Sequence, residues 1–343
     1  MVSRMMVPNT TMSQPEACIF ATCEDFDPAV DLLAWMMAHD LPVAARYVNW
    51  LGRTVQQVRE EHALQRALTA RTRRAPFAVV PDPQAVRQDL RDHVTAEQQA
   101  GRLPLTAPSP TPLAWQLRNL LQAIGLPLIA LLALPFFIVL SPLLIAMLRK
   151  RETTDPEFCP RPDADAVRTM QQQEDHDVTN SFTALGAVKA GRFRRWLLIV
   201  LLLALDYTAR HIFTRGHLTR VQTIHFARWV FLDDKTRVVF CSNYDGSHES
   251  YMDDFINKVA WGLNIVFSNG FGWPHTDWLV ARGARREVQF KHYQRRHQLP
   301  TQVWYKAYPG LTASELWRNA RIREGLERER MSDAEVREWL RLL

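Results

Sequence analysis

Five side chains that could do acid–base or anion chemistry lie in apolar or loop surroundings in the C-terminal half of the chain. His225 and Arg228 share one aromatic stretch, Asn243 and Asp245 come just before a glycine, and His275 ends a loop of two glycines and two aromatic residues. A histidine in such a place can act as an acid, a base or a ligand. An arginine amid aromatic residues can bind a carboxylate or a propionate. We therefore predict His225, Arg228, Asp245 and His275 as candidate catalytic residues.

Each of these residues also has a structural interpretation. Arg228 could form an ion pair with Asp245 or with a helix carboxylate, because an unpaired charge amid aromatic residues is costly. Asn243 and Asp245 precede Ser247, and such residues are typical of a turn followed by a helix cap. His225 could be a satisfied structural histidine, and the loop before His275 could be a tightly packed turn.

The charge and the cysteines limit the partners and the compartment. The formal net charge is +6, and two basic clusters, 149–151 and 192–195, flank apolar segments, which predicts contact with anionic lipid headgroups. The sequence has no zinc-finger spacing, RNP-like motif or helix-turn-helix signature, so we predict no nucleic-acid partner. Four scattered cysteines are typical of a reducing compartment, so we place the soluble parts in the cytoplasm.

Residues 123–148 form an apolar run without a charged residue. Since about 20 apolar residues can cross a bilayer, we predict a membrane segment over 113–150, with its basic C-terminal end facing the cytoplasm. Pro127, Pro135 and Pro142 would kink this helix, and Pro135 could divide it into the two arms of a re-entrant hairpin. The second apolar run, Trp196–Leu205, is too short to cross and predicts a core helix or an interfacial helix.

Residues 179–330 alternate strand and helix patterns in the order of a ferredoxin-like, split βαβ domain. The predicted strands are 181–188, 223–232, 237–242 and 301–307, and the predicted helices are 192–213, 247–263, 284–297 and 312–328. Thr312 and Glu315 predict a capping box for the last helix. The predicted fold class is α+β: a ferredoxin-like domain, a partial second copy of it, and an apolar membrane-anchoring helical segment.

An internal repeat at a constant offset of 258 residues predicts the partial second copy over 16–70. His39-Asp40-Leu41-Pro42 matches His297-Gln298-Leu299-Pro300, and Tyr47, Gly52, Thr54 and Leu68 match Tyr305, Gly310, Thr312 and Leu326. Within this copy we predict strands at 18–23 and 43–48 and helices at 28–38 and 54–68. The remaining segments are a Pro-rich linker (71–112, with a short helix near 84–100), a polar linker (151–178) and a helical tail (331–343). A sheet shared by both copies requires them to lie on one side of the membrane, which a single crossing would prevent.

Three segments, 224–229, 242–247 and 300–305, resemble a group of uncharacterised bacterial membrane-associated proteins. At the level of fold, the plan is similar to the dimeric α+β barrel superfamily. That superfamily includes the haem-binding dye-decolorising peroxidases and chlorite dismutases as well as haem-free monooxygenases. The peroxidase motif G-x-x-D-G is matched here by Ser242–Gly246 with Ser in place of the first Gly, which would put Asp245 on the distal side of a haem. The resemblance also implies a homodimer.

Two hypotheses of function follow. The first is a membrane-associated oxidoreductase or monooxygenase that holds haem or an apolar substrate from the bilayer, with His211, His225, Arg228 and Asn243 as candidate cofactor-binding residues. The second is a non-catalytic binding or assembly module on the membrane. No pair of histidines or cysteines has zinc spacing, so we predict no metal ion. Walker, G-x-S-x-G and dinucleotide motifs do not occur in the sequence.

Overall fold

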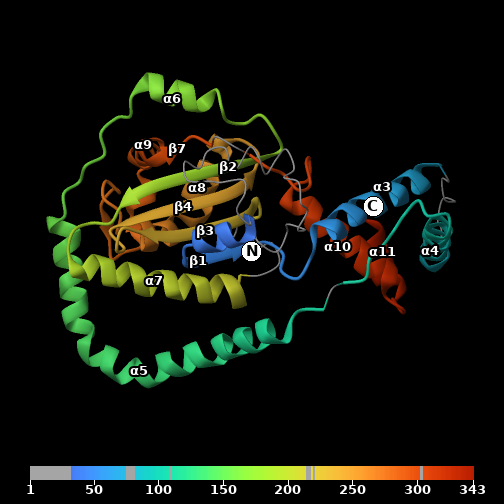
Figure 1. Ribbon diagram of the computed structural model, residues 1–343, viewed down its shortest axis with the longest axis horizontal. Coiled ribbons are helices and arrows are strands. Elements are labelled where there is room, and N and C mark those ends of the chain that lie inside the picture. The colour runs from blue at the N-terminus through green and yellow to red at the C-terminus, as the bar shows by residue number, and fades with distance from the viewer. Residues whose placement is uncertain (1–31, 75–81, 109, 214–217, 219–220, 302–303) are drawn as a thin grey trace.

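A five-stranded sheet forms the centre of the protein (Figure 1). The computed structural model describes residues 32–343 except for 75–81, 109, 214–217, 219–220 and 302–303. The strands lie in the order β1-β3-β4-β2-β7, and each neighbouring pair is antiparallel. They are β1 (Val43–Val48), β2 (Thr179–Ala187), β3 (Ile224–Leu232), β4 (Arg237–Asp245) and β7 (Gln298–Leu299). The α+β class is therefore confirmed.

Helices surround this sheet and extend beyond it. They are α2 (Leu32–Ala38), α3 (Val55–Arg74), α4 (Pro83–Gln99), α5 (Leu113–Thr154), α6 (Ala164–Gln171), α7 (Arg192–His211), α8 (His248–Phe267), α9 (Glu287–His297), α10 (Ala313–Glu327) and α11 (Asp333–Leu340). A small hairpin of β5 (Thr276–Asp277) and β6 (Ala281–Arg282) follows α8, and a 3-10 turn, η2 (Gly283–Arg285), leads into α9. Helix α6 stands apart from the sheet in Figure 1.

The main core lies between the sheet and helices α7 and α8. It joins Leu198 and Leu202 of α7 to Trp229 and Phe240 of the sheet. Helix α8 forms where the sequence predicts it, because Ser247 caps its N-terminus by accepting a hydrogen bond from the Ser250 backbone N–H. An apolar stripe of this helix is buried in this core: Tyr251, Phe255, Val259 and Leu263.

A second core joins the two copies of the internal repeat. Helices α3 and α10 begin at Val55 and Ala313, which are 258 residues apart (313 − 55), and they pack against each other. Helices α4 and α11 complete this helical group (Figure 1). The corresponding leucine and isoleucine residues of the two copies meet in its interior: Leu64, Leu68, Ile322 and Leu326. Thr312 and Glu315 form the predicted capping box at the start of α10.

The predicted strand at 301–307 is wrong for 301 and 304–307, the residues of this range that the structure describes, because none of them lies in a strand. The strand in this place is β7, which has two residues and ends before Pro300. Proline has no N–H to donate to a ladder and fixes its own φ, so the ladder cannot continue through it. Tyr305 is 54% exposed, whereas Tyr47, its counterpart in the repeat, is 1% exposed. The predicted strand at 18–23 lies outside the described residues, and of the predicted helix at 28–38 the structure describes α2.

The predicted membrane segment is a single long helix, α5. It is the one helix among the described residues that is long and apolar enough to cross a membrane, and its most apolar stretch has no buried residue. Pro127, Pro135 and Pro142 lie inside it, and Figure 1 shows that it first passes below α7 and then turns sharply past the N-terminal end of α7. Prolines break a helical hydrogen bond each, which accounts for such a bend.

Candidate functional site

The strongest pairing among the predicted site residues joins His225 and Asp245 at one end of the sheet. His225 Nε2 lies 2.6 Å from Asp245 Oδ1, and the histidine side chain is almost fully buried. The strand register shifts between Ile224 and Phe226, so His225 sits in a bulge that turns its ring toward the end of β4. Asp245 therefore pairs with His225 and not with Arg228, and the proposed Arg228–Asp245 ion pair is wrong.

Asp245 is held from three sides. Its Oδ1 also accepts a hydrogen bond from Thr179 Oγ1 at 3.3 Å, and its Oδ2 accepts one from the backbone N–H of Ala313, the first residue of α10, at 2.7 Å. A carboxylate at a helix N-terminus is favourably placed against the helix dipole. The ring of Tyr308 stacks on His225 at 6.1 Å between centroids, and burial raises the pKa of Tyr308 to about 12. The group ties the sheet to α10.

The hydrogen bond to Asp245 orients the His225 ring. Because a carboxylate oxygen only accepts hydrogen bonds, the imidazole donates from Nε2 to Asp245 Oδ1. His225 Nδ1 is buried and has no hydrogen-bond partner among the described residues, and the same holds for the side-chain nitrogen and oxygen of Asn49. The backbone N–H of Asn49 donates to the His225 carbonyl at 2.9 Å. The His225 ring is enclosed, since the residue is 1% exposed.

Arg228 and Asn243 share one face of the sheet, since the register partners of Asn243 and Cys241 are Phe226 and Arg228. Ala227 and Trp229 are buried on the opposite face, whereas Arg228 is half-buried. The bulge breaks the alternation at its start, where Ile224 and His225 are both buried. Arg228 is directly opposite Arg46 of β1 and opposite Cys241 of β4. Like charges directly opposite each other in a sheet are unfavourable, and no acidic side chain of the described residues pairs with Arg228.

His275 contacts the C-terminal end of α5. Its Nε2 lies 2.9 Å from the Asp155 carbonyl oxygen, and its Nδ1 lies 3.6 Å from a Glu157 carboxylate oxygen. The loop before it, with Asn269 and Trp273 both 0% exposed, packs into the protein. His275 therefore helps to hold the end of α5 in place, and the structural interpretation of this loop is confirmed.

Glu152 and Asp155, which sequence reasoning did not single out, fix this end of α5. Glu152 accepts hydrogen bonds from Thr276 Oγ1 at 3.0 Å and from the backbone N–H groups of Trp278 and Leu279 at 3.1 and 2.7 Å. Trp278 and Leu279 have positive φ angles of 53° and 65°, so the carboxylate stabilises a strained turn between β5 and β6.

Asp155 forms a buried ion pair with Arg194 of α7, at 2.8 Å between Asp155 Oδ2 and Arg194 Nη2. The Arg194 side chain is 1% exposed. Lys189 lies 4.0 Å from the same carboxylate oxygen, and burial together with Arg194 lowers the pKa of Lys189 to about 8 although Asp155 opposes this. A carboxylate that holds two buried cations costs several kcal/mol to remove, so the junction of α5 and α7 is firmly built.

The other end of the apolar run is attached to the same helix, α7. Gln122 Nε2 donates to Asp206 Oδ2 at 3.0 Å, and Tyr207 Oη donates to the Ala123 carbonyl at 3.2 Å. His211 lies one turn further along, with its ring 4.9 Å from that of Tyr207. Burial and Arg210 lower the pKa of His211. Helix α5 thus forms an arch between the two ends of α7. The apolar side chains in the middle of this arch, residues 128–139, are largely exposed.

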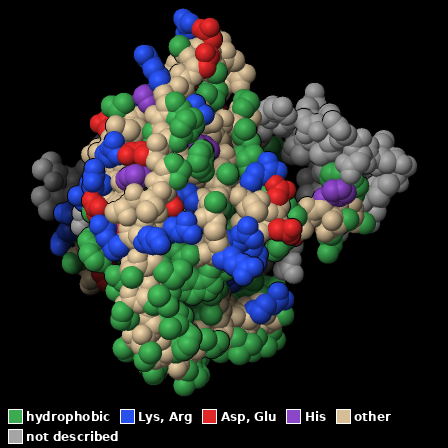
Figure 2. Space-filling view, turned by 90° about the vertical axis from the view of Figure 1, so that its left-hand side faces the viewer, with side chains coloured by type: hydrophobic (Ala, Val, Ile, Leu, Met, Phe, Trp, Pro, Cys, Tyr) green, Lys and Arg blue, Asp and Glu red, His purple; other side chains and the backbone are tan. Residues whose placement is uncertain are grey.

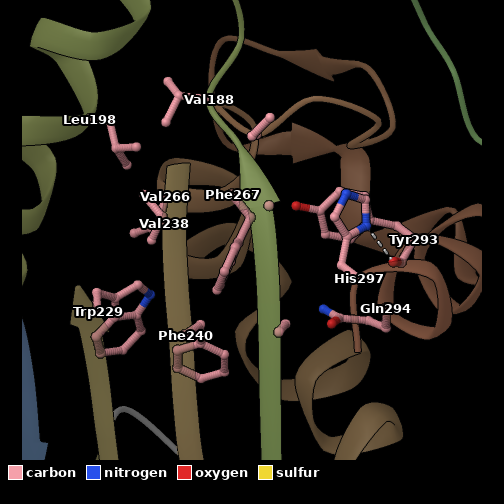
Figure 3. A pocket seen from close by; sticks show the side chains of 14 residues that line it. Val188, Leu198, Trp229, Val238, Phe240, Val266, Phe267, Tyr293, Gln294 and His297 are labelled. Carbon is pink, nitrogen blue, oxygen red and sulfur yellow. Dashed lines mark hydrogen bonds between the residues drawn. The ribbon is translucent and has the colours of Figure 1, made fainter. Parts of the chain in front are cut away.

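A small cavity lies where β2 meets helices α7, α8 and α9 (Figure 3). Its volume is about 30 Å³, which is room for one or two water molecules. In Figure 3, Trp229 and Phe240 lie on one side of β2, and Tyr293 and His297 of α9 lie on the other. Ligand pockets for drug-sized molecules measure roughly 300–1,000 Å³, so this cavity does not fit a haem.

The predicted haem residues do not form a haem site together. His225 has its Nε2 on Asp245 and its ring against Tyr308, and His275 contacts the end of α5. No hydrogen bond or ring contact joins His211, His225 and His275 to one another within the described part of the chain. These surroundings do not fit a haem ligand. Among the described residues, no group of three or more His, Cys, Asp or Glu side chains could hold a metal ion.

Comparisons with protein-family models, with curated proteins and with solved structures found no match. The resemblance to the dimeric α+β barrel superfamily therefore stays a prediction. Two features of the described residues bear on function: the His225–Asp245 junction, and the arch of α5 with its attachments to both ends of α7.

Proposed function

We propose that this protein is a monotopic membrane protein: α5 dips into one leaflet of a bilayer and returns, and the rest of the chain stays on one side as a binding or assembly module. The observation that supports this proposal is the arch itself. Both ends of its apolar run are hydrogen-bonded to α7, whereas its middle is bare, with Ile129 62%, Leu132 73% and Val139 78% exposed. Large apolar side chains exposed in this way need a covering.

The lengths of the two helices suit a shallow arch. From Ala123 to Asp155 the helix has a contour of about 48 Å, at about 1.5 Å per residue, whereas the stretch of α7 between the attached residues Arg194 and Tyr207 is about 20 Å long. The helix therefore has to bow outward, by at most about 22 Å for two equal arms on that base. Since the hydrocarbon core is about 30 Å thick, the arch falls short of the far side of the bilayer. Crossing twice as a helix would take about 40 residues.

The sheet also argues for one side of the membrane. Strand β1 precedes α5 and pairs with β3, which follows it. Helix α3 precedes α5 and packs on α10, which follows it. A single complete crossing would pull both pairs apart. The basic residues at 149–151 favour the cytoplasmic side for the soluble parts.

The folded part supports a binding role more than catalysis. We propose a ferredoxin-like, split βαβ fold for residues 179–330. The strand order β7-β2-β4-β3, with α7 and α8 in the connections, supports this fold. His225 and Asp245 are committed to holding α10, and the cavity at β2 holds no more than water. The helical group around α3 and α10 remains for a partner or for a second copy.

The direct test is attachment to lipid vesicles. Purified full-length protein, exchanged from detergent into phosphatidylcholine vesicles, is expected to float with the lipid and to stay attached in high salt and in alkaline carbonate, because the attachment is apolar. Release by salt would mean that charge alone holds the protein. A protein that stays in solution as a defined dimer without lipid would mean that a second copy covers α5, and the proposal would fail.

A further inference from the structure

Six cations of two separate sequence clusters come together where the C-terminal end of α5 meets the N-terminal end of α7. Two of them are used inside the protein: Arg149 pairs with Glu152, and Arg194 pairs with Asp155. The other four are at the surface: Lys150, Arg151, Arg192 and Arg195. We call these four the basic rim.

The basic rim is held in place by the backbone of the connection between β2 and α7. A methyl group on Gly191 would meet Arg151 Nη2 at 3.1 Å, so the absence of a side chain there lets the guanidinium lie against the start of α7. Arg151 Nη1 lies 3.8 Å from Asp155 Oδ1, and Asp155 also pairs with Arg194. Lys150, Arg192 and Arg195 have no ion pair with any described residue. Four cations are therefore crowded together with little compensating negative charge.

This crowding is unfavourable for the isolated protein. The first turn of α7 holds arginines and no acidic residue, and no side chain caps its N-terminus. Cations at a helix N-terminus oppose the helix dipole, and they repel each other. A bound anion would relieve both effects. The four cations are therefore arranged as in a binding site for negatively charged groups.

The basic rim borders the apolar surface of the arch. Figure 2 shows a band of Lys and Arg side chains directly above the hydrophobic surface at the bottom of the molecule. Trp196 of α7 follows Arg195 and is 39% exposed. Val200 and Leu203 continue an exposed apolar stripe at helical spacing, at 37% and 48% exposure. Cations and a tryptophan beside an apolar surface are typical of the level of lipid headgroups.

We infer that the basic rim binds the phosphate groups of anionic phospholipids. This inference rests on the proposed function, since the arch is what brings the rim to the bilayer. The occupant has to carry negative charge and lie beside hydrocarbon, and an anionic leaflet does both. Nucleic acid or a soluble acidic protein would match the charge but would leave the arch and Trp196 exposed.

The test compares vesicles of phosphatidylcholine alone with vesicles that also contain phosphatidylglycerol, at low salt. The full-length protein is expected to bind the anionic vesicles more tightly. Replacing Lys150, Arg192 and Arg195 together by glutamine is expected to remove most of this gain, at about 5-fold per cation and on the order of 100-fold for the three. Binding to the phosphatidylcholine vesicles is expected to stay unchanged. Because none of the three has an ion pair, the variant is expected to fold, and circular dichroism checks this.

A matched control removes the same charge from the other end of the molecule. Arg66 and Arg73 of α3 and Arg337 of α11 are exposed and have no ion pair with a described residue, and α3 and α11 lie far from the rim in Figure 1. An equal loss in this control would show an effect of net charge only and would overturn the inference. Equal binding of the wild-type protein to both kinds of vesicle would also overturn it and leave the proposed function intact. No binding to either kind would refute the proposed function itself.

Discussion

Replacing Ile129 of α5 with arginine is expected to release the protein from the membrane. Ile129 is 62% exposed in the apolar middle of α5. At the centre of a membrane helix, arginine costs about 2.5–3.5 kcal/mol and isoleucine gains about 0.5 kcal/mol. The exchange therefore weakens attachment by about 3 kcal/mol, or on the order of 100-fold in the partition coefficient. No folding contact is lost, since the side chain is not in either core.

The assay is flotation with phosphatidylcholine vesicles over a range of lipid concentrations. The matched control is Val288→Arg, because Val288 of α9 is also 62% exposed, and α9 lies at the sheet edge opposite β1, α7 and α5 in Figure 1. The control is expected to bind as the wild type does. Unchanged binding of Ile129→Arg, or an equal loss in both variants, would refute the reasoning that α5 is the part that enters the lipid.

Three further predictions concern stability in detergent, measured by denaturant unfolding. Glu152→Gln replaces one of the two carboxylate oxygens with an NH2 group, which can neither accept the hydrogen bond from the Trp278 N–H nor pair with Arg149. It is expected to lower the free energy of unfolding by about 1–3 kcal/mol; an unchanged value would show that the turn needs no carboxylate. Arg228→Thr relieves the repulsion from Arg46 and is expected to raise the free energy of unfolding by about 0.2–1 kcal/mol. A lower free energy of unfolding would show that Arg228 makes a favourable contact. Burial holds the pKa of Lys189 at about 8, below its usual 10.5, so the folded protein releases this proton first as pH rises. The free energy of unfolding should therefore increase between those two pH values. Lys189→Met should abolish this increase. If the increase persists in the variant, other groups cause it.

The sheet and its neighbours could be predicted because their signals are local. Apolar and aromatic stretches bounded by turn residues predicted β2, β3 and β4 to within a few residues, and the capping residues predicted the starts of α8 and α10. The same reasoning failed at 301–307, where an aromatic run imitates a strand. There the single Pro300 and the contacts of Trp304 outweigh propensity: its indole N–H donates to the Thr179 carbonyl across the start of β2.

The candidate sites could be predicted only in part, because their geometry depends on distant segments. His225 and Asp245 were recognised one by one, but their pairing needs the β3–β4 register and the bulge. Glu152 was assigned to a linker, and its partners at 276–279 are more than 120 residues away. A signal was present: an acidic residue within the basic cluster after an apolar run has to find a partner, because a buried carboxylate is costly without one.

The measurement that tests the central claim most directly is the sidedness of residues before and after α5. In a variant without the native cysteines, single cysteines replace Arg102, which precedes α5, and Glu338, which follows it; both side chains are exposed, at 63% and 65%. A membrane-impermeant maleimide is then applied to inverted membrane vesicles and to intact spheroplasts. The account predicts that both positions react from the cytoplasmic side and that neither reacts from the other side. Reaction of the two positions from opposite sides would show a complete crossing and would contradict the account.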